Sequence, residues 1–333
     1  MSTIALPTRK HLELELMHRW TTRTFRSLVG IPDDIELWQT LAPKDALKFD
    51  FLMDGILALS ALDIAVSPCA ADVSVYVQAA LQYYEQASGQ YRWQLSNLTK
   101  ENHQAVFLFG LLAVAINLVI PHCVSDGLEQ TSTLDHVLVA FDLLHGISAI
   151  TLSCWDWLKD GPITFPLEEF RRNPLHLLDD NTKKSIKRLH AVNEAHRTPN
   201  GQGLAKTSDA TRQLFKNCII NLEFLFAKEI EDEIRCICTA FPGLCGKEFT
   251  SAVAESNPMA LFILMHWGVL LARLGHDAWW ARPAGKNLVA ELSVSLALLQ
   301  NDYAPEWEEG ILWARNEAEL QGLAQVGGVS ILV

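Results

Sequence analysis

An uncharged apolar run from Ala105 to Ile120 is the feature that most constrains the fold of this chain. The run is shorter than the roughly 20 residues that a helix needs to span a bilayer. Asn117 lies inside it, and Pro121, which interrupts the hydrogen-bond ladder of a helix, follows it. We therefore expect a helix buried in a protein core, around which the rest of the chain must pack.

Apolar residues recur at helical spacing in most of the remaining chain, for example at Leu12, Leu16 and Trp20 and again between Leu134 and Leu152. Strand-like alternation of β-branched residues is nearly absent. With 333 residues, of which 49% are hydrophobic, the chain can bury a large core. The sequence therefore predicts an all-α protein.

Residues 1–333 are predicted to form a single large helical domain, with a flexible linker at about 197–209 between its halves. The linker segment is polar and rich in glycine, which is typical of loops. Ser208 or Asp209 is predicted to cap a long helix that continues to Phe241.

The charge balance argues against direct binding of nucleic acid. The formal net charge is −12, so the chain as a whole repels a phosphate backbone. The segment from Met1 to Lys10 lacks the apolar region of a secretory signal. The chain has seven cysteines, an odd number, and they are scattered along the sequence. This pattern favours a reducing compartment, in which cysteines stay as free thiols. We expect a soluble intracellular protein without a membrane span, cytoplasmic if it is an enzyme and nuclear if it is a regulator.

Three blocks of sequence carry a resemblance to a known family. They are 11–22, 51–62 and 257–282, and the last contains Asn257-Pro258-Met259, His266-Trp267-Gly268 and Trp279-Trp280. In this order they resemble the C-terminal regulatory, ligand-binding domain of fungal zinc-cluster transcription factors of the sterol uptake control type. The resemblance covers nearly the whole chain and is weakest at about residues 160–210.

The zinc cluster that gives this family its name is missing. That DNA-binding module needs closely spaced cysteine doublets whose thiolates bridge two zinc ions. The densest set in this chain is Cys236, Cys238 and Cys245, which lacks such a doublet. We predict a packing role for these cysteines, no metal site and no cofactor.

The resemblance implies a hydrophobic ligand cavity inside the helical domain, sterol-sized in the best-known members. Tryptophans suit the walls of such a cavity, because each presents a large flat apolar face and one N–H donor. The candidate ligand-binding residues are five tryptophans and one arginine. Two tryptophan pairs form indole-rich patches, Trp155 with Trp157 and Trp279 with Trp280, and Trp267 and Arg273 complete the set. Packing in the core is the alternative role of these indoles.

Two titratable residues beside tryptophans are the candidate catalytic groups. Asp156 lies between Trp155 and Trp157, where burial is expected to raise its pKa and to suit it to proton transfer. His266 precedes Trp267 on a predicted apolar helix. A core histidine with satisfied hydrogen bonds is the alternative interpretation of His266.

Two functions fit these features. The first is a stand-alone pericyclase of fungal secondary metabolism, which couples a tropolone o-quinone methide with a humulene-type sesquiterpene by a hetero-Diels–Alder reaction. The chain resembles the hetero-Diels–Alderases of tropolone–sesquiterpenoid pathways, which carry none of the usual catalytic motifs. The second is a non-enzymatic domain that senses a sterol or terpenoid for a transcription factor. In both cases the expected partner is a hydrophobic small molecule (terpenoid, tropolone or sterol-like). The apolar tail 329–333 is expected either to fold over a pocket or to pack into a homodimer.

Overall fold

The structure, a computed structural model, describes residues 9–68, 72–123, 132–163, 166–195, 208–274, 278–298, 305–320, 323–326 and 329–332. Nearly all regular elements in these ranges are helices, so the predicted all-α class is confirmed. The exception is a short antiparallel hairpin of β1 (Leu323–Val326) and β2 (Val329–Leu332).

The chain divides into two compact units, and each is described by itself. One comprises Met1–Leu128 with Gly146–Phe165, and the other comprises Glu129–His145 with Pro166–Val333. The expectation of one domain over residues 1–333 stays a prediction. The linker expected at about 197–209 lies outside the described residues, except for Ser208 and Asp209.

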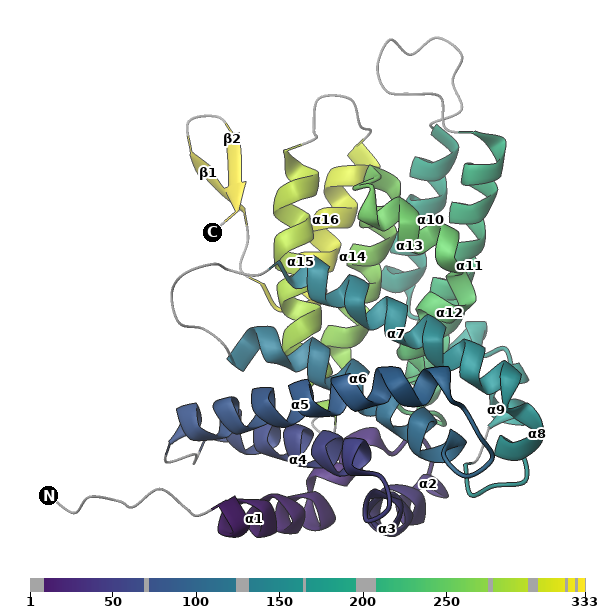
Figure 1. Ribbon diagram of the computed structural model, residues 1–333. Coiled ribbons are helices and arrows are strands. Elements are labelled where there is room, and N and C mark those ends of the chain that lie inside the picture. The colour runs from purple at the N-terminus through teal and green to yellow at the C-terminus, as the bar shows by residue number, and fades with distance from the viewer. Residues whose placement is uncertain are drawn as a thin grey trace, which may run out of the picture. The chain divides into compact units, whose positions relative to one another are not determined.

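The first unit is built around three adjacent helices, α4 (Asp50–Ala65), α5 (Val73–Ser96) and α6 (His103–Cys123), with α1 (Arg9–Thr22) beside α4 (Figure 1). Its shorter elements are η1 (Thr24–Leu28), α2 (Asp34–Glu36), η2 (Leu37–Leu41), α3 (Ala42–Ala46) and α8 (Trp155–Leu158). The end of α7 (Thr133–Ser153) also belongs to this unit.

Helix α6 is the core helix that the apolar run predicted. Its residues from Ala105 to Val119 are buried except for Leu111. Pro121 lies within the last turn instead of ending the helix, because a proline there removes only one backbone hydrogen bond near the helix end.

Two described helices, α6 and α7, are long and apolar enough to cross a membrane by length and composition. Their most apolar stretches are 72% buried in α6 and 28% buried in α7. The burial of α6 agrees with a core helix, whereas that of α7 gives the predicted absence of a membrane span only weak support.

A buried ion pair fixes α1 against α4. Asp63 is fully buried, and its carboxylate accepts hydrogen bonds from Arg19 Nε at 2.8 Å and from the Thr24 hydroxyl at 2.7 Å. One residue further along α1, Trp20 Nε1 donates to the Trp38 carbonyl at 2.9 Å. These bonds satisfy polar groups that would otherwise be costly to bury.

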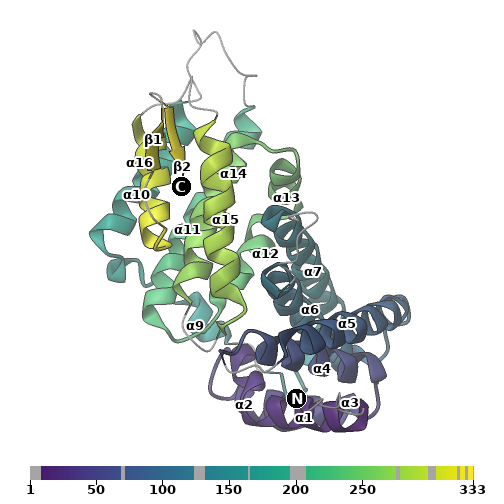
Figure 2. The same cartoon turned by 90° about the vertical axis from the view of Figure 1, so that its left-hand side faces the viewer.

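The second unit is a helical bundle. Its longer helices are α10 (Asp180–Ala195), α11 (Asp209–Glu231), α14 (Pro258–Arg273), α15 (Ala281–Ala297) and α16 (Pro305–Glu317). Helices α15, α16 and α10 all pack against α14 in this bundle (Figure 2). Shorter elements are α9 (Leu167–Arg171), η3 (Leu175–Leu177), η4 (Ile237–Ala240), α12 (Phe241–Cys245) and α13 (Lys247–Ala254).

Residues of the third family-like block, 257–282, cap α14 and allow it to pack closely against α15. Asn257 Oδ1 accepts the backbone N–H groups of Met259 and Ala260 at 3.0 and 3.2 Å, and Pro258 occupies the first turn of α14. A Cβ atom on Gly285 of α15 would lie 2.5 Å from the Gly268 carbonyl oxygen. The two helices therefore approach so closely that only glycine fits.

The predicted helix from Ser208 to Phe241 is correct at its start and wrong at its end. The Ser208 hydroxyl accepts the Thr211 N–H at 3.1 Å and caps α11 as expected. The helix stops at Glu231, because Asp232 adopts a left-handed conformation with φ 53°. The acidic side chains in its last turn are also unfavourable for the helix, because they lie at the negative end of the helix dipole.

We predict that Arg19→Ala lowers the free energy of unfolding by about 3 kcal/mol, because it removes the main partner of a buried carboxylate. Lys48→Ala is the matched control, since Lys48 pairs with Asp45 on the surface of the same unit. It should change the stability by about 0.5 kcal/mol or less. Urea unfolding of both variants checks this, and equal effects would contradict the assigned role of Arg19.

Candidate functional site

His266, the first predicted catalytic residue, lies in the core of the second unit with both ring nitrogens engaged. Its Nδ1 is 2.8 Å from the Phe262 carbonyl oxygen, so Nδ1 carries the proton and donates it there. Its Nε2 then accepts from the Ser185 hydroxyl at 3.0 Å. Burial lowers the pKa of His266 to about 4, so the ring is neutral at pH 7. This is the core-histidine alternative, and it leaves no ring N–H for a ligand.

Asp156, the second predicted catalytic residue, belongs to the first unit, and its expected burial is wrong. The side chain is 85% exposed, because the flanking Trp155 and Trp157 are themselves more than a third exposed. Lys159 Nζ donates to the Asp156 carboxylate at 2.6 Å, and this bond lowers the pKa of Asp156. A carboxyl group with a lowered pKa is a poor proton donor at neutral pH.

The predicted ligand-binding tryptophans are divided between the two units. Trp155 and Trp157 lie on α8 of the first unit, where the Trp157 ring makes an edge contact with His103 at 5.6 Å. Trp267, Trp279 and Trp280 belong to the second unit. Trp267 is a packed core residue, since its Nε1 donates to the Cys238 carbonyl at 2.8 Å. Trp280 is buried, and the buried Trp279 Nε1 has no hydrogen-bond partner within the described residues.

His266 and Arg273 both contact the side chain of Trp313. The His266 ring stacks on Trp313 at 5.1 Å, and the Arg273 guanidinium lies 5.9 Å from the Trp313 ring. Arg273 also pairs with Glu317 at 2.6 Å. These contacts tie α14 to α16 and explain both predicted residues as parts of a packed interface between helices.

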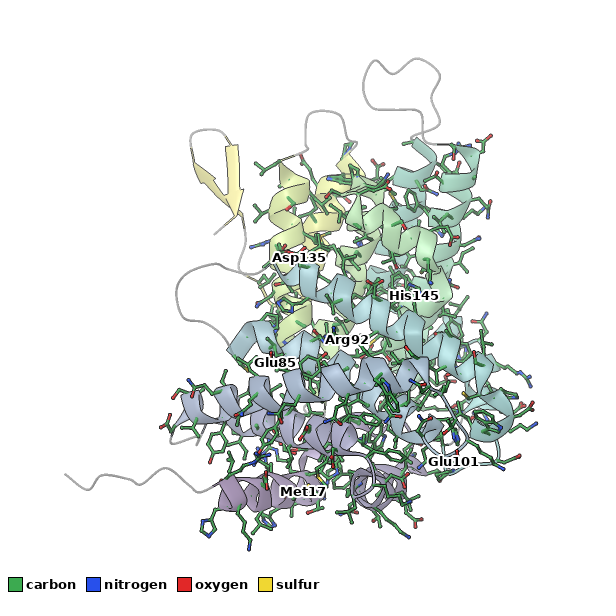
Figure 3. All side chains as sticks on the ribbon, viewed as in Figure 1. Met17, Glu85, Arg92, Glu101, Asp135 and His145 are labelled. Carbon is green, nitrogen blue, oxygen red and sulfur yellow. The ribbon has the colours of Figure 1, made fainter. Side chains whose placement is uncertain are left out.

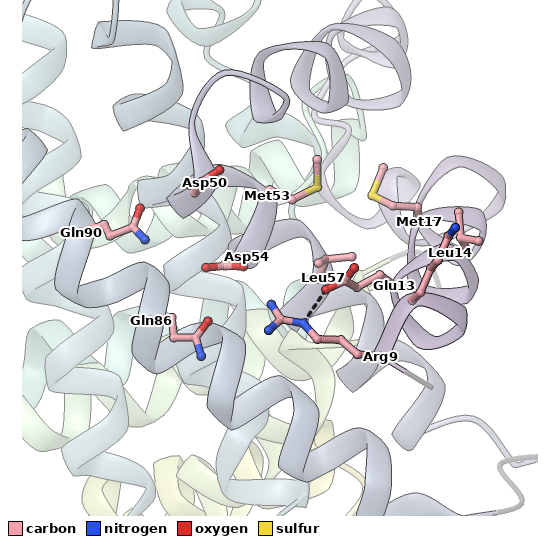
Figure 4. A pocket seen from close by; sticks show the side chains of 11 residues that line it. Arg9, Glu13, Leu14, Met17, Asp50, Met53, Asp54, Leu57, Gln86 and Gln90 are labelled. Atoms are coloured by element: carbon pink, nitrogen blue, oxygen red, sulfur yellow. Dashed lines mark hydrogen bonds and ion pairs between the residues drawn. The ribbon is translucent and has the colours of Figure 1, made fainter. Parts of the chain in front are cut away.

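A groove in the first unit is the better candidate site. It has a volume of about 530 Å³, which falls in the range of small-molecule sites. Three helices supply its lining, for example through Met17 on α1 (Figure 3) and through Asp54 on α4 and Gln86 on α5 (Figure 4). The complete lining is Arg9, Lys10, Glu13, Leu14, Met17, Asp50, Met53, Asp54, Leu57, Gln86 and Gln90.

Asp54 is the chemically distinctive residue of this groove. Its side chain is half-buried, and burial raises the pKa of Asp54 to about 6. The Asp50 carboxylate, one turn earlier on α4, adds repulsion in the same direction, and Arg9 opposes it. A carboxyl group with a pKa near 6 still holds its proton in roughly a tenth of the molecules at pH 7. It is therefore suited to donate a proton or a hydrogen bond.

The surroundings of Asp54 combine apolar and amide groups. Leu57 is buried and Met53 half-buried on the same helix, and Met17 faces them from α1 (Figure 4). Gln86 and Gln90 lie one turn apart on the exposed side of α5. At the edge of the groove, Arg9 Nε donates to Glu13 at 2.8 Å. Such a site offers an apolar molecule a contact surface and offers an oxygen atom several donors.

Asp54 lies in the second family-like block, 51–62, but was not among the predicted site residues. The available signal was a second carboxylate in a largely apolar helix, one turn after Asp50. Across the described ranges, no group of three or more His, Cys, Asp and Glu side chains is arranged to hold a metal ion. The predicted internal cavity stays a prediction.

We predict that the stability of the protein falls as the pH drops below 6.5, partly because unfolded His266 binds a proton that the folded core excludes. With a folded pKa of about 4, His266 contributes stability above pH 6.5, and about 3 kcal/mol of it is lost by pH 4. His266→Gln should remove this part of the pH dependence. Denaturant unfolding of both proteins at pH 7.5 and pH 5 measures the difference, and parallel pH curves would show that His266 is not buried neutral.

Asp54 should act in the opposite direction. Its folded pKa is raised, so its stabilising contribution is complete below pH 3.8 and is lost as the pH rises through about 6. Asp54→Asn should therefore stabilise the protein at pH 7.5, on the order of 1 kcal/mol after allowance for partial exposure, with little effect at pH 4. The exposed Asp160→Asn is the control in the same unit. An equal effect of Asp54→Asn at both pH values would be inconsistent with the raised pKa.

Comparison with protein-family models and with curated proteins gives no match for this chain. The resemblance carried by the three sequence blocks therefore stays a prediction, and the function has to be argued from the groove.

Proposed function

We propose that this chain is a cofactor-independent pericyclase that binds its substrates in the groove around Asp54. The proposed reaction is the hetero-Diels–Alder coupling of a tropolone o-quinone methide with a humulene-type sesquiterpene. The observation that carries the proposal is a half-buried carboxyl group of pKa about 6 beside apolar side chains in a groove of about 530 Å³. In this proposal the general acid is Asp54. The predicted acids His266 and Asp156 are replaced, because their surroundings do not suit proton donation.

The acid step begins with a tropolone that bears a hydroxymethyl group next to the ring hydroxyl. The Asp54 carboxyl group donates its proton to the hydroxymethyl oxygen, the carbon–oxygen bond breaks, and water leaves. The ring hydroxyl then gives its proton to the Asp54 carboxylate, which restores the acid and leaves a neutral o-quinone methide. Proton transfer by a positioned side chain typically accelerates such a step by about 10²–10⁴-fold.

The coupling step needs orientation more than side-chain chemistry. The heterodiene of the quinone methide and one alkene of the sesquiterpene form a carbon–carbon and a carbon–oxygen bond together. Holding the two partners in register contributes several kcal/mol, up to about 7–11 in ideal systems. We assign to Gln86 and Gln90, which line the groove, the hydrogen bonds to the quinone methide carbonyl that stabilise the charge developing on it.

Binding of the sesquiterpene is assigned to the apolar side chains of the groove. Met17, Met53, Leu14 and Leu57 provide its apolar lining. Burial of about 300 Å² of terpenoid surface contributes on the order of 7 kcal/mol before the costs of association. Methionine suits a ligand of irregular shape because its side chain is flexible and polarizable.

A ligand-sensing regulatory domain is the second candidate. It is favoured by the resemblance itself, which is to a regulatory domain, and by the structural roles that Arg19, Asn257 and Gly268 have in two of the three blocks. A regulator would bind a sterol or terpenoid in the same groove without turnover.

The test is incubation of the protein with a hydroxymethyl tropolone and a hydroxylated humulene. We expect faster coupling and one dominant stereoisomer, and we expect Asp54→Asn to slow the reaction at least about tenfold while retaining sesquiterpene binding. Asp156→Asn is the control and should react like the wild type. Identical product mixtures with and without protein would exclude the pericyclase, and sesquiterpene binding without turnover would favour the regulator.

A further inference from the structure

Two buried thiols of the second unit lie on helices that pack together, α11 and α12. Cys218 lies on α11 and is fully buried, and Cys245 is the last residue of α12 and is 7% exposed. Burial raises the pKa of the Cys245 thiol, and the neighbouring Cys218 thiol raises it further. An independent bond joins the same two segments next to the thiols, since Asn221 Nδ2 donates to the Leu244 carbonyl at 3.0 Å.

We infer that Cys218 and Cys245 are a disulfide-forming pair that joins α11 to α12 when the protein meets a small disulfide oxidant such as oxidised glutathione. The pair lies about 27 residues apart in the sequence, so the bond would close a substantial loop of the unfolded chain. The inference does not depend on the groove, because both residues belong to the second unit.

The exchange proceeds in two balanced steps. The Cys245 thiolate, at the more accessible end of the pair, attacks one sulfur of oxidised glutathione and releases one reduced glutathione. The Cys218 thiolate then attacks the Cys245 sulfur of the mixed disulfide and releases the second. Both cysteines are oxidised, the oxidant is reduced to two thiols, and the two cysteine protons end on them.

The burial of the two thiols favours slow oxidation. Burial raises the pKa of Cys245, so little thiolate is present until the local structure opens. The competing pair is Cys236 and Cys238, which are two residues apart. Cys238 is fully buried, and burial also raises its pKa well above the ordinary value. Cys236 is half-buried and therefore more accessible than Cys245, but its neighbour Cys238 is not. Within the pair of Cys218 and Cys245, Cys245 has the more accessible thiol and is the expected entry point.

The bond would act on a segment that supports α14. Phe241 of α12 stacks on Trp267 at 6.1 Å, and the Cys238 carbonyl just before α12 accepts the Trp267 indole N–H. A covalent bond between α12 and α11 would therefore restrain the segment that contacts Trp267.

The experiment treats the native full-length protein with excess oxidised glutathione, then denatures it in an alkylating reagent and maps the peptides by mass spectrometry. We expect a mass lower by two hydrogens, a cross-linked peptide pair containing Cys218 and Cys245, and a rise in Tm of roughly 5 °C that dithiothreitol reverses. Cys245→Ser should abolish the cross-link, and Cys154→Ser, at a buried thiol of the first unit, should leave it unchanged.

The peptide map of the wild type decides the outcome even if a variant fails to fold. Alkylation of both Cys218 and Cys245 after oxidation would overturn the inference. So would a glutathione adduct that persists on Cys245, or a cross-link between Cys236 and Cys238 instead.

Discussion

The buried carboxylate of Asp63 is the constraint on which the first unit depends. It sits at the far end of α4 from Asp54 and holds Arg19 and Thr24, so it sets where α1 lies along α4. The groove exists because α1 supplies one of its walls, through Arg9, Glu13 and other residues. The Asp63 ion pair thus fixes the α1 wall that helps to bury Asp54, and Asp50, one turn earlier on α4, adds charge repulsion that raises the pKa of Asp54 further.

The second unit shows how a motif can carry structural rather than chemical information. In α14, the His-Trp-Gly sequence combines a histidine with both nitrogens bonded, an indole that donates to a backbone carbonyl, and a glycine at a close helix approach. Each residue has a sufficient reason in packing. A buried polar group that is fully hydrogen-bonded specifies one arrangement of the core, since any alternative would leave it unsatisfied.

Local patterns predicted much of the fold. The apolar run ending near Pro121 indicated α6, and Ser208 indicated the start of α11, because hydrophobic periodicity and capping act over a few residues. The predicted end of α11 was wrong, since the left-handed conformation of Asp232 depends on how the following turn packs.

The site was harder to predict for the same physical reason. Whether Asp156 or Asp54 is buried depends on which helices cover it, and tryptophans next to Asp156 in the sequence do not ensure burial when they are partly exposed themselves. Asp54 gains its surroundings from α1 and α5, at sequence distances that no local pattern reports. His266 looked reactive only because its partners Ser185 and Trp313 are far away in the sequence.

The most direct test of this account is an NMR titration of the aspartate side-chain carboxyl carbons, with Asp54→Asn used to assign the Asp54 resonance. The account predicts a midpoint near pH 6, well separated from those of exposed aspartates. A midpoint near the ordinary aspartate value of about 4 would contradict it, because the groove would then hold no proton donor at neutral pH.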